Sequence, residues 1–283
     1  MTLGDLAALS ATEIVALVKA RQISPVEVVK ASLDRIERCN PTLNAVVTLN
    51  EQAIEDAIAL EASIKASSDT HVLCGVPVGI KDLTPVAGLR TTYGSPIFSD
   101  HIPKEDAIIV QRLRSEGAII VGKTNTPEFG AGASTFNEVF GRTRNPWNPE
   151  RTSGGSTGGG AAALASGLIG IAEGSALAGS LRIPSSLCGL VGLRPSPPLP
   201  PLRSRSPSSF LSFFSLGFPP SSPPPTPSSP RPPLPAPPPP LPPPPPPSPP
   251  PPPLRPPPPP PLPPLSLPPP PPRRPPLLHS PPP

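Results

Sequence analysis

Apolar residues recur at helical spacing over residues 1–65, behind two helix-start signals. Ser10–Glu13 and Ser24–Glu27 both fit the capping box, in which a serine and a glutamate three residues apart each bond the other's backbone amide. In the second box, Pro25 occupies the first helical position, which proline tolerates well. The pattern therefore predicts a helix after each box and a further surface helix over residues 53–66.

From residue 71 the pattern changes to short apolar runs that alternate with helical segments. Residues 76–80 and 118–121 are compact, rich in β-branched side chains and bounded by glycine, which predicts buried strands. Residues 105–116 between them predict a helix. Alternation of this kind indicates an α/β fold with a largely parallel or mixed sheet covered by helices. The remaining predicted elements are a helix over residues 160–166 and strands over 168–172 and 190–193.

Composition changes abruptly after residue 194. Most of the 59 prolines follow this point, and the tail is built almost wholly of Pro, Ser, Leu and Phe. Proline lacks an amide donor and fixes φ, so polyproline II or disorder is expected there. We therefore divide the chain into an N-terminal helical part (1–70), a core (71–196) and a Pro-rich low-complexity tail (197–283).

The net charge of +4 does not indicate a nucleic-acid partner, because all 19 acidic residues precede the tail and the surplus of arginine lies within it. The three cysteines are widely separated and form no C-x-x-C pair, which indicates neither a disulfide framework nor a zinc site. We find no signal-peptide pattern and no run of about 18 apolar residues. A cytoplasmic protein without a membrane partner is expected.

Residues 154–184 hold four serines among glycines and alanines, and a flexible linker or a phosphate loop explains them poorly. Alanine in helical runs disfavours a linker. A phosphate loop requires a lysine after its last glycine, and this chain has no lysine after Lys123. An acyl-transfer nucleophile remains, since glycine amides beside a serine can bind an oxyanion. A serine needs a base, and Lys81 ends the apolar run VPVGI, where burial would lower its pKa. A lysine that snorkels from a strand end stays open as the alternative.

Five motifs in register give the chain a family resemblance. GVPVGIKD, GKTNTPEFG, RNPWNP, GGSTGG and GSALAGSLRIPSSLCGLVGLRPS resemble, in order and spacing, the amidase signature family over about residues 5–196. The resemblance implies that family's fold, a Ser-cisSer-Lys triad that cleaves carboxamides, and no metal or organic cofactor. Lys81 falls on the general base, Ser156 on the cis serine that relays the proton, and Ser180 on the acylated nucleophile. The oxyanion amides would come from Leu177, Ala178, Gly179 and Ser180.

The chain departs from the family pattern at several positions. Thr157 replaces a serine of the glycine loop but keeps a hydroxyl, and Ala178 stands where glycine is commonest. Ala176 replaces an aspartate, which implies that Arg182 loses its acidic partner; a buried, unpaired cation would cost several kcal/mol and put activity in question. The other serines, Ser153, Ser166 and Ser175, are expected to be structural.

The sequence stops resembling the family near residue 196, although the family's sheet continues beyond that point. About half of the expected domain is therefore absent. Two interpretations of the tail compete. A genuine Pro-rich arm would bind SH3- or WW-like domains through its PxxP motifs. A shifted reading frame through pyrimidine-rich DNA would also give Pro, Ser, Leu and Phe, and the abrupt change favours it. Translating the other two frames tests this hypothesis.

Three functions are open at this stage. The first is a hydrolase acting on a small-molecule amide, with a homodimer as one possible assembly. The second is the A-type subunit of a glutamine-dependent amidotransferase that acts on aminoacyl-tRNA, which TNTPEFGAG disfavours. The third is an inactive scaffold or Pro-rich interaction protein, which Ala176 and the truncation favour.

Overall fold

The computed structural model describes residues 2–66, 71–194 and 212–216. The remainder of the tail, with the polyproline II, disorder and SH3- or WW-binding predictions that concern it, lies outside the described residues. The helices are α1 (Leu3–Leu6), α2 (Ala11–Lys19), α3 (Pro25–Leu43), α4 (Ala53–Ala66), α5 (Ile108–Ser115), α6 (Gly158–Ala165) and α7 (Arg182–Cys188), with short 3-10 turns η1 (Pro96–Phe98) and η2 (Glu128–Gly130). The strands are β1 (Val46–Leu49), β2 (Pro77–Lys81), β3 (Ile119–Thr124), β4 (Phe136–Asn137), β5 (Gly141–Arg142), β6 (Ile171–Ser175) and β7 (Ser212–Leu216).

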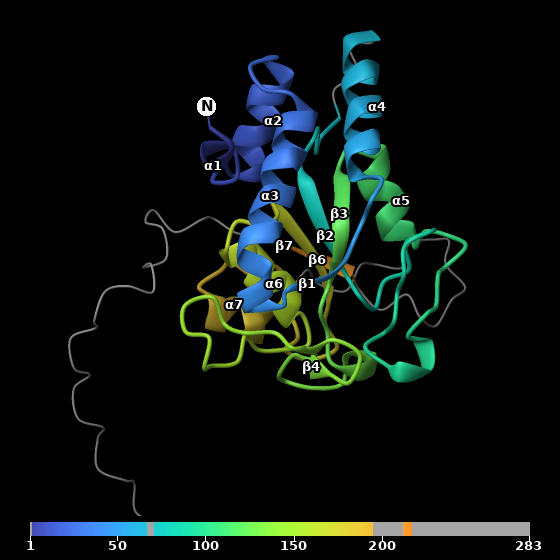
Figure 1. Cartoon of the computed structure of the whole chain (residues 1–283), viewed down its shortest axis with the longest axis vertical. Helices are drawn as coiled ribbons and strands as arrows, with labels where there is room; N and C mark the ends of the chain where they lie inside the picture. Colours follow the sequence, from blue (N-terminus) through green and yellow to red (C-terminus); the bar gives the residue numbers. More distant parts are fainter. Residues whose placement is uncertain (1, 67–70, 195–211, 217–283) are drawn as a thin grey trace, which may run out of the picture. The chain divides into compact units, whose positions relative to one another are not determined.

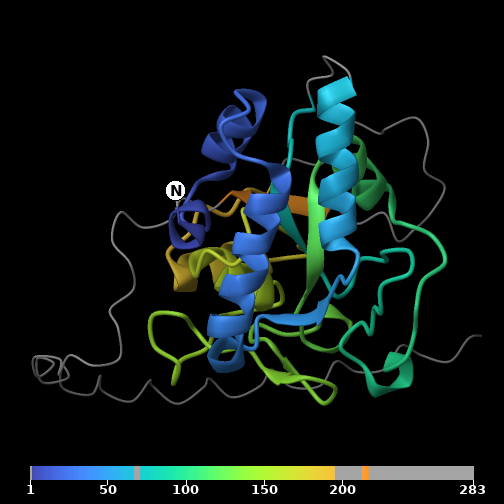
Figure 2. The same cartoon turned by 45° about the horizontal axis from the view of Figure 1, so that its top comes forward.

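A mixed sheet in the order β1-β3-β2-β6-β7 forms the centre of the fold (Figure 1). The inner strands β3, β2 and β6 run parallel, whereas β1 and β7 pair antiparallel with their neighbours. In both views α3 and α4 lie side by side across the sheet (Figures 1 and 2). The predicted α/β class, a mixed sheet covered by helices, is confirmed.

Strand β7 lies within the tail for which we expected polyproline II or disorder. Its sequence, SFFSL, is free of proline, so each of its residues keeps the amide that a strand ladder needs. It pairs with β6 from Ile171↔Leu216 to Ser175↔Ser212 and occupies the edge of the sheet. This short segment therefore differs from the composition-based expectation because composition describes the tail as a whole.

The N-terminal helices follow the local signals. Ser10 and Ser24 both cap with the reciprocal glutamate bonds of a capping box, and Pro25 is the first residue of α3. Helix α4 spans the predicted residues 53–66. Each cap satisfies amides that a helix start leaves without an intrahelical partner. These predictions are confirmed.

Of the two strands predicted near the C-terminal end of the core, one is present with shifted bounds and the other is wrong. Strand β6 begins at Ile171, three residues later than expected, and residues 190–193 form no strand. Instead, Gly189 in the left-handed region ends α7, and the Leu190 amide returns to the Ser185 carbonyl at 2.8 Å. An apolar run thus marks burial or a helix end as readily as a strand.

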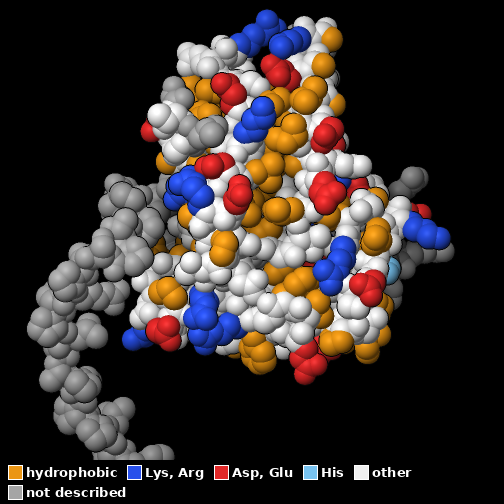
Figure 3. Space-filling view, in the orientation of Figure 1, with side chains coloured by type: hydrophobic (Ala, Val, Ile, Leu, Met, Phe, Trp, Pro, Cys, Tyr) orange, Lys and Arg blue, Asp and Glu red, His pale blue; other side chains and the backbone are white. Residues whose placement is uncertain are grey.

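Apolar side chains pack on both faces of the sheet. Along β3, Ile119 and Val121 join one cluster, with α3, α4 and α6, while Ile120 joins the other, with α2 and α5. This alternation is what the pleat of a strand imposes. Figure 3 shows apolar side chains in the seam between α3 and α4, where Leu33, Ile54 and Leu60 pack against the first of these clusters.

An irregularity in the β2–β3 ladder changes which face the next residues occupy. Val78 pairs with Ile120, but Gly79 pairs with Gly122, so one residue of β3 is skipped. Lys123 therefore pairs with Ile80 rather than with Lys81. Because paired residues share a face, the two buried lysines lie on opposite faces of the sheet.

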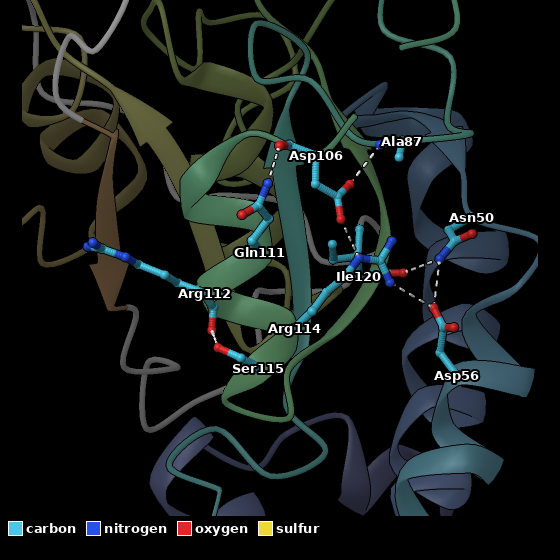
Figure 4. A network of polar contacts seen from close by, with 9 residues as sticks. All are labelled: Asn50, Asp56, Ala87, Asp106, Gln111, Arg112, Arg114, Ser115 and Ile120. Carbon is cyan, nitrogen blue, oxygen red and sulfur yellow. Dashed lines mark hydrogen bonds and ion pairs between the residues drawn. The ribbon is translucent and has the colours of Figure 1, made fainter. Parts of the chain in front are cut away.

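A polar network joins α4, α5 and the sheet (Figure 4). Arg114 on α5 forms ion pairs with Asp56 at 3.3 Å and Asp106 at 3.1 Å. Asp106 also accepts the Ala87 amide at 2.7 Å, and Asn50 donates to the Ile120 carbonyl at 2.7 Å. The guanidinium therefore links two helices through two carboxylates that are themselves held in place.

The three cysteines, Cys39, Cys74 and Cys188, are unpaired thiols. Burial raises the pKa of the Cys188 thiol to about 12.

Across the described ranges, none of the helices combines the length and the apolar character needed to cross a membrane.

We expect Arg114→Met to lower the free energy of unfolding by about 1 kcal/mol at low salt, because two carboxylates lose a shared partner. Arg38→Met is the matched control, since Arg38 pairs with Asp34 on the exposed face of a single helix. The control should lose only about 0.3 kcal/mol. Urea unfolding at low salt and in 1 M NaCl measures both, and equal losses would contradict a bridging role.

Candidate active site

Lys81 ends β2, a strand whose five residues are all buried. Ile80 faces the cluster formed with α2 and α5, so the pleat turns Lys81 toward the opposite face, where α6 begins. There its Nζ donates to Ser156 Oγ at 2.8 Å, to Thr157 Oγ1 at 3.0 Å and to Ser175 Oγ at 3.2 Å. Three hydroxyls thus surround the amine.

Burial lowers the pKa of Lys81 to about 7, although the nearby Glu173 carboxylate acts in the other direction. A substantial neutral fraction exists at neutral pH, and a neutral amine can accept a proton. A snorkelling lysine would instead keep its charged end in water. Lys81 is 0% exposed, so that alternative is wrong.

Ser156 follows a cis peptide bond with Gly155 and is almost wholly buried. The loop of residues 132–134 packs directly against this peptide. A Cβ on Gly155 would lie 2.8 Å from the Ser134 amide nitrogen and 2.9 Å from the Gly132 carbonyl oxygen. Only glycine fits at this position, and the close packing fixes where the Ser156 hydroxyl points.

Ser180 contacts the backbone of Thr157, the residue that follows Ser156. The Thr157 amide donates to the Ser180 carbonyl at 3.2 Å, which joins the glycine loop to the segment before α7. Ser180 is partly exposed, whereas Lys81 and Ser156 are buried. Ser156 and Ser180 both lie in the described part of the chain, and their hydroxyl groups form no hydrogen bond with each other. The arrangement therefore has its basic group inside and Ser180 at the surface.

The segment between β6 and α7 carries the predicted oxyanion amides. Those of Leu177, Ala178, Gly179 and Ser180 donate to no acceptor within the described residues. Leu177 is 82% exposed. Amides that are free in the protein and grouped beside a hydroxyl suit an anionic oxygen, because they need no reorganisation to bind it.

The expectation that Arg182 would be a buried, unpaired cation is wrong. Its side chain is exposed and donates from Nη2 to the Ala178 carbonyl at 2.9 Å. Solvent therefore stabilises the charge, and the desolvation cost does not arise. Ala176, where the family pattern has an aspartate, is buried against Leu181 and contributes apolar packing instead.

Glu173 is a site residue that sequence reasoning missed. The β2–β6 ladder pairs only Val78↔Ile171 and Gly79↔Ala172, and beyond it the Glu173 carboxylate takes over as acceptor. It accepts the Lys81 amide at 3.0 Å and the Thr84 hydroxyl at 3.1 Å. Burial raises the pKa of Glu173. An acidic residue directly after a predicted buried strand was the available signal.

Two of the serines expected to be structural do stay away from the amine, but the third does not. Ser166 is the C-cap of α6, and the Ser153 hydroxyl donates to the Thr143 carbonyl at 3.4 Å. Ser175 contacts Lys81 Nζ, so it belongs to the site. Its position one residue after Gly174, at the end of a parallel strand, was the signal in the sequence.

A second buried basic group lies on the other face of the sheet. Lys123 Nζ donates to the Thr84 carbonyl and to Thr91 Oγ1. Burial lowers the pKa of Lys123 to about 8, with the Asp82 carboxylate acting in the other direction. Asp82 in turn accepts the Thr92 amide and hydroxyl. This group supports the strands that carry Lys81 without touching the serines.

Among the described residues, His, Cys, Asp and Glu side chains form no cluster of three that could hold a metal ion.

Comparison with protein families and curated proteins places these residues in context. The family model described as Amidase matches residues 27–205. An acylamidase of Rhodococcus erythropolis is 46% identical over 197 residues, which cover 69% of this chain and 41% of that protein. The A-type subunit of the glutamyl-tRNA(Gln) amidotransferase of Carboxydothermus hydrogenoformans is 47% identical over 189 residues, covering 66% and 39%.

The fold has solved relatives as well. A bacterial aryl acylamidase belonging to the amidase signature enzymes superimposes with a TM-score of 0.69 at 37% identity, covering 74% of this chain and 45% of that one. The chain spans about two fifths of the length of the curated relatives named above.

We expect Glu173→Gln to lower the pKa of Lys81 below about 7. The amide keeps an acceptor for the Lys81 N–H but removes the carboxylate charge that favours the ammonium form. A pH titration of the Lys81 ε-methylene by ¹³C NMR, assigned with Lys81→Met, measures it. Glu55→Gln, an exposed change on α4, is the control. An unchanged Lys81 pKa would mean that Glu173 is already neutral in the folded protein.

Proposed function

Because the chain belongs to the amidase signature family, we propose that it hydrolyses the C–N bond of a small-molecule carboxamide, with Ser180 as nucleophile. The observation that carries the proposal is the 2.8 Å contact between Lys81 Nζ and Ser156 Oγ, made by a wholly buried amine whose pKa is lowered to about 7. A base of this strength matches general-base work at neutral pH.

Acylation begins with proton transfer through Ser156. Neutral Lys81 accepts the proton of the Ser156 hydroxyl, and Ser156 takes the hydroxyl proton of Ser180. At the same time Ser180 Oγ bonds to the carbonyl carbon of the amide. The carbonyl oxygen gains a negative charge and lies among the free amides of the segment from Leu177 to Ser180. The partly exposed position of Ser180 gives the substrate access to it.

Collapse of this intermediate reverses the direction of the proton. The ammonium of Lys81 returns a proton through Ser156 to the leaving nitrogen as the C–N bond breaks, which leaves an ester on Ser180. Water then attacks the ester through the same relay and releases the acid. Thr157 and Ser175 hold Nζ in place through their hydroxyls throughout.

A second candidate is one component of an amidotransferase, which releases ammonia from glutamine for a partner enzyme acting on aminoacyl-tRNA. It is supported by the 47% sequence identity to a protein named as such a component. The sequence identity to the acylamidase is nearly the same, at 46%. Glutamine as the preferred amide, and co-purification of a partner, would favour this candidate over the first.

We expect Ser180→Ala to lower amide hydrolysis by at least about a thousandfold, because the acyl-enzyme no longer forms. Ammonia release from simple aliphatic and aromatic amides by the full chain measures the loss. Ser186→Ala, on the exposed side of α7, is the matched control and should keep full activity. Equal release from Ser180→Ala and the parent chain would exclude the mechanism. Silence of the parent chain toward a fluorophosphonate probe would indicate an inactive scaffold.

We expect kcat/KM to rise with pH through a midpoint of about 7 and to level off above it, because only the neutral form of Lys81 accepts a proton. Below the midpoint the amine is protonated and hydrolysis falls tenfold per pH unit. Hydrolysis of one amide from pH 5 to 9 measures the profile, with Lys81→Met as the inactive reference. A rate that falls as pH rises through 7 would contradict Lys81 as the base.

A further inference from the structure

Four aromatic rings meet on two loops, one of which passes beside Ser156. Tyr93 and Phe98 pack edge to face at 5.1 Å between centroids, and His101 stacks on Tyr93 at 5.8 Å. Phe129 meets Phe98 edge to face at 6.2 Å. We call Tyr93, Phe98, His101 and Phe129 the aromatic cluster. Its spacing is that of favourable aromatic contacts.

The aromatic cluster adjoins the reacting groups through Gly130. A Cβ on Gly130 would lie 3.7 Å from Ser156 Oγ, so the chain that carries Phe129 passes directly beside the relay hydroxyl. The Phe129 amide donates to the Tyr93 carbonyl at 2.7 Å, which ties the two loops together. The same loop continues into residues 132–134, which pack on the Gly155–Ser156 peptide.

Two members of the cluster hold an unusual backbone conformation. Tyr93 has φ of 55° and Phe129 has φ of 48°, in the left-handed region that bulky side chains rarely adopt. Phe129 is nevertheless 54% exposed, so burial of its own ring does not explain the conformation. Residues held this way concentrate at ligand sites, where the surrounding structure fixes them for binding.

We propose that the aromatic cluster binds an aromatic ring of the amide substrate, with the half-exposed Phe129 ring as the contact that a ligand completes. The inference rests on the proposed hydrolysis and names its substrate class. A substrate ring would pack edge to face on Phe129, as Phe98 already does from inside. Glutamine, which carries two charges and no ring, gains nothing from this surface.

The ring can belong to either part of the amide. Ser156 returns the proton to the leaving nitrogen, so a group on that nitrogen lies on the side of Ser156 and Gly130. Acetanilide carries its ring there, phenylacetamide carries it on the acyl part, and acetamide has none. These three amides separate the sources of the ring.

The test compares kcat/KM of the full chain for these three amides in Phe129→Ala and Phe98→Ala. We expect a roughly three- to tenfold loss for a ring-bearing amide and none for acetamide. Phe136→Ala is the matched control, since Phe136 is 63% exposed on β4 and outside the aromatic cluster. Thermal melting identifies a variant that fails to fold, and the other variant then decides. Equal losses for all three amides overturn the inference.

Binding separates this inference from the proposed function. Saturation-transfer NMR of acetanilide and phenylacetamide with Ser180→Ala requires no turnover. If no amide is hydrolysed in a Ser180-dependent way, the proposed function fails. Ring binding that Phe129→Ala weakens and Phe136→Ala does not would still support the aromatic site. Absent binding, or binding that Phe129→Ala leaves unchanged, overturns it.

Discussion

An amine held out of water among hydroxyl groups is the interaction on which this site depends. No carboxylate of the described residues lies within ion-pair distance of Lys81 Nζ, and the three contacts come from Ser156, Thr157 and Ser175. Burying an ammonium ion with neutral partners alone is costly, so the balance shifts toward the free amine. The same burial that makes the group expensive makes it a base at neutral pH.

The sheet is built to keep that amine in place. Where the β2–β6 ladder ends, Glu173 supplies the next acceptor for the Lys81 amide. One skipped residue in β3 moves Lys123 to the other face, where Asp82 is its acidic neighbour. The two buried lysines on neighbouring strands therefore point to opposite faces of the sheet. On the same face, two ammonium groups would repel each other strongly in the low dielectric of the interior.

Lys81 and the aromatic cluster lie on parts of the chain that differ in regularity. Lys81 lies at the end of β2, and Ser156 lies in the closely packed loop that precedes α6. The aromatic cluster and the free amides lie on loops, where side chains stay accessible. Loops of this kind can change in sequence without disturbing the strand end that holds Lys81.

The sequence by itself determined the helix starts and the mixed α/β class, because capping boxes and pleat alternation are local signals. It also singled out Lys81, Ser156 and Ser180 as candidates, whose roles stay predictions. It did not determine the start of β6, the coil at residues 190–193 or the exposure of Arg182, since apolar runs carry no information about their partners. Only the tertiary structure showed that Ser175 and Glu173 contact Lys81. Those contacts join residues more than ninety positions apart, and distance in space between such residues is set by how the strands pair.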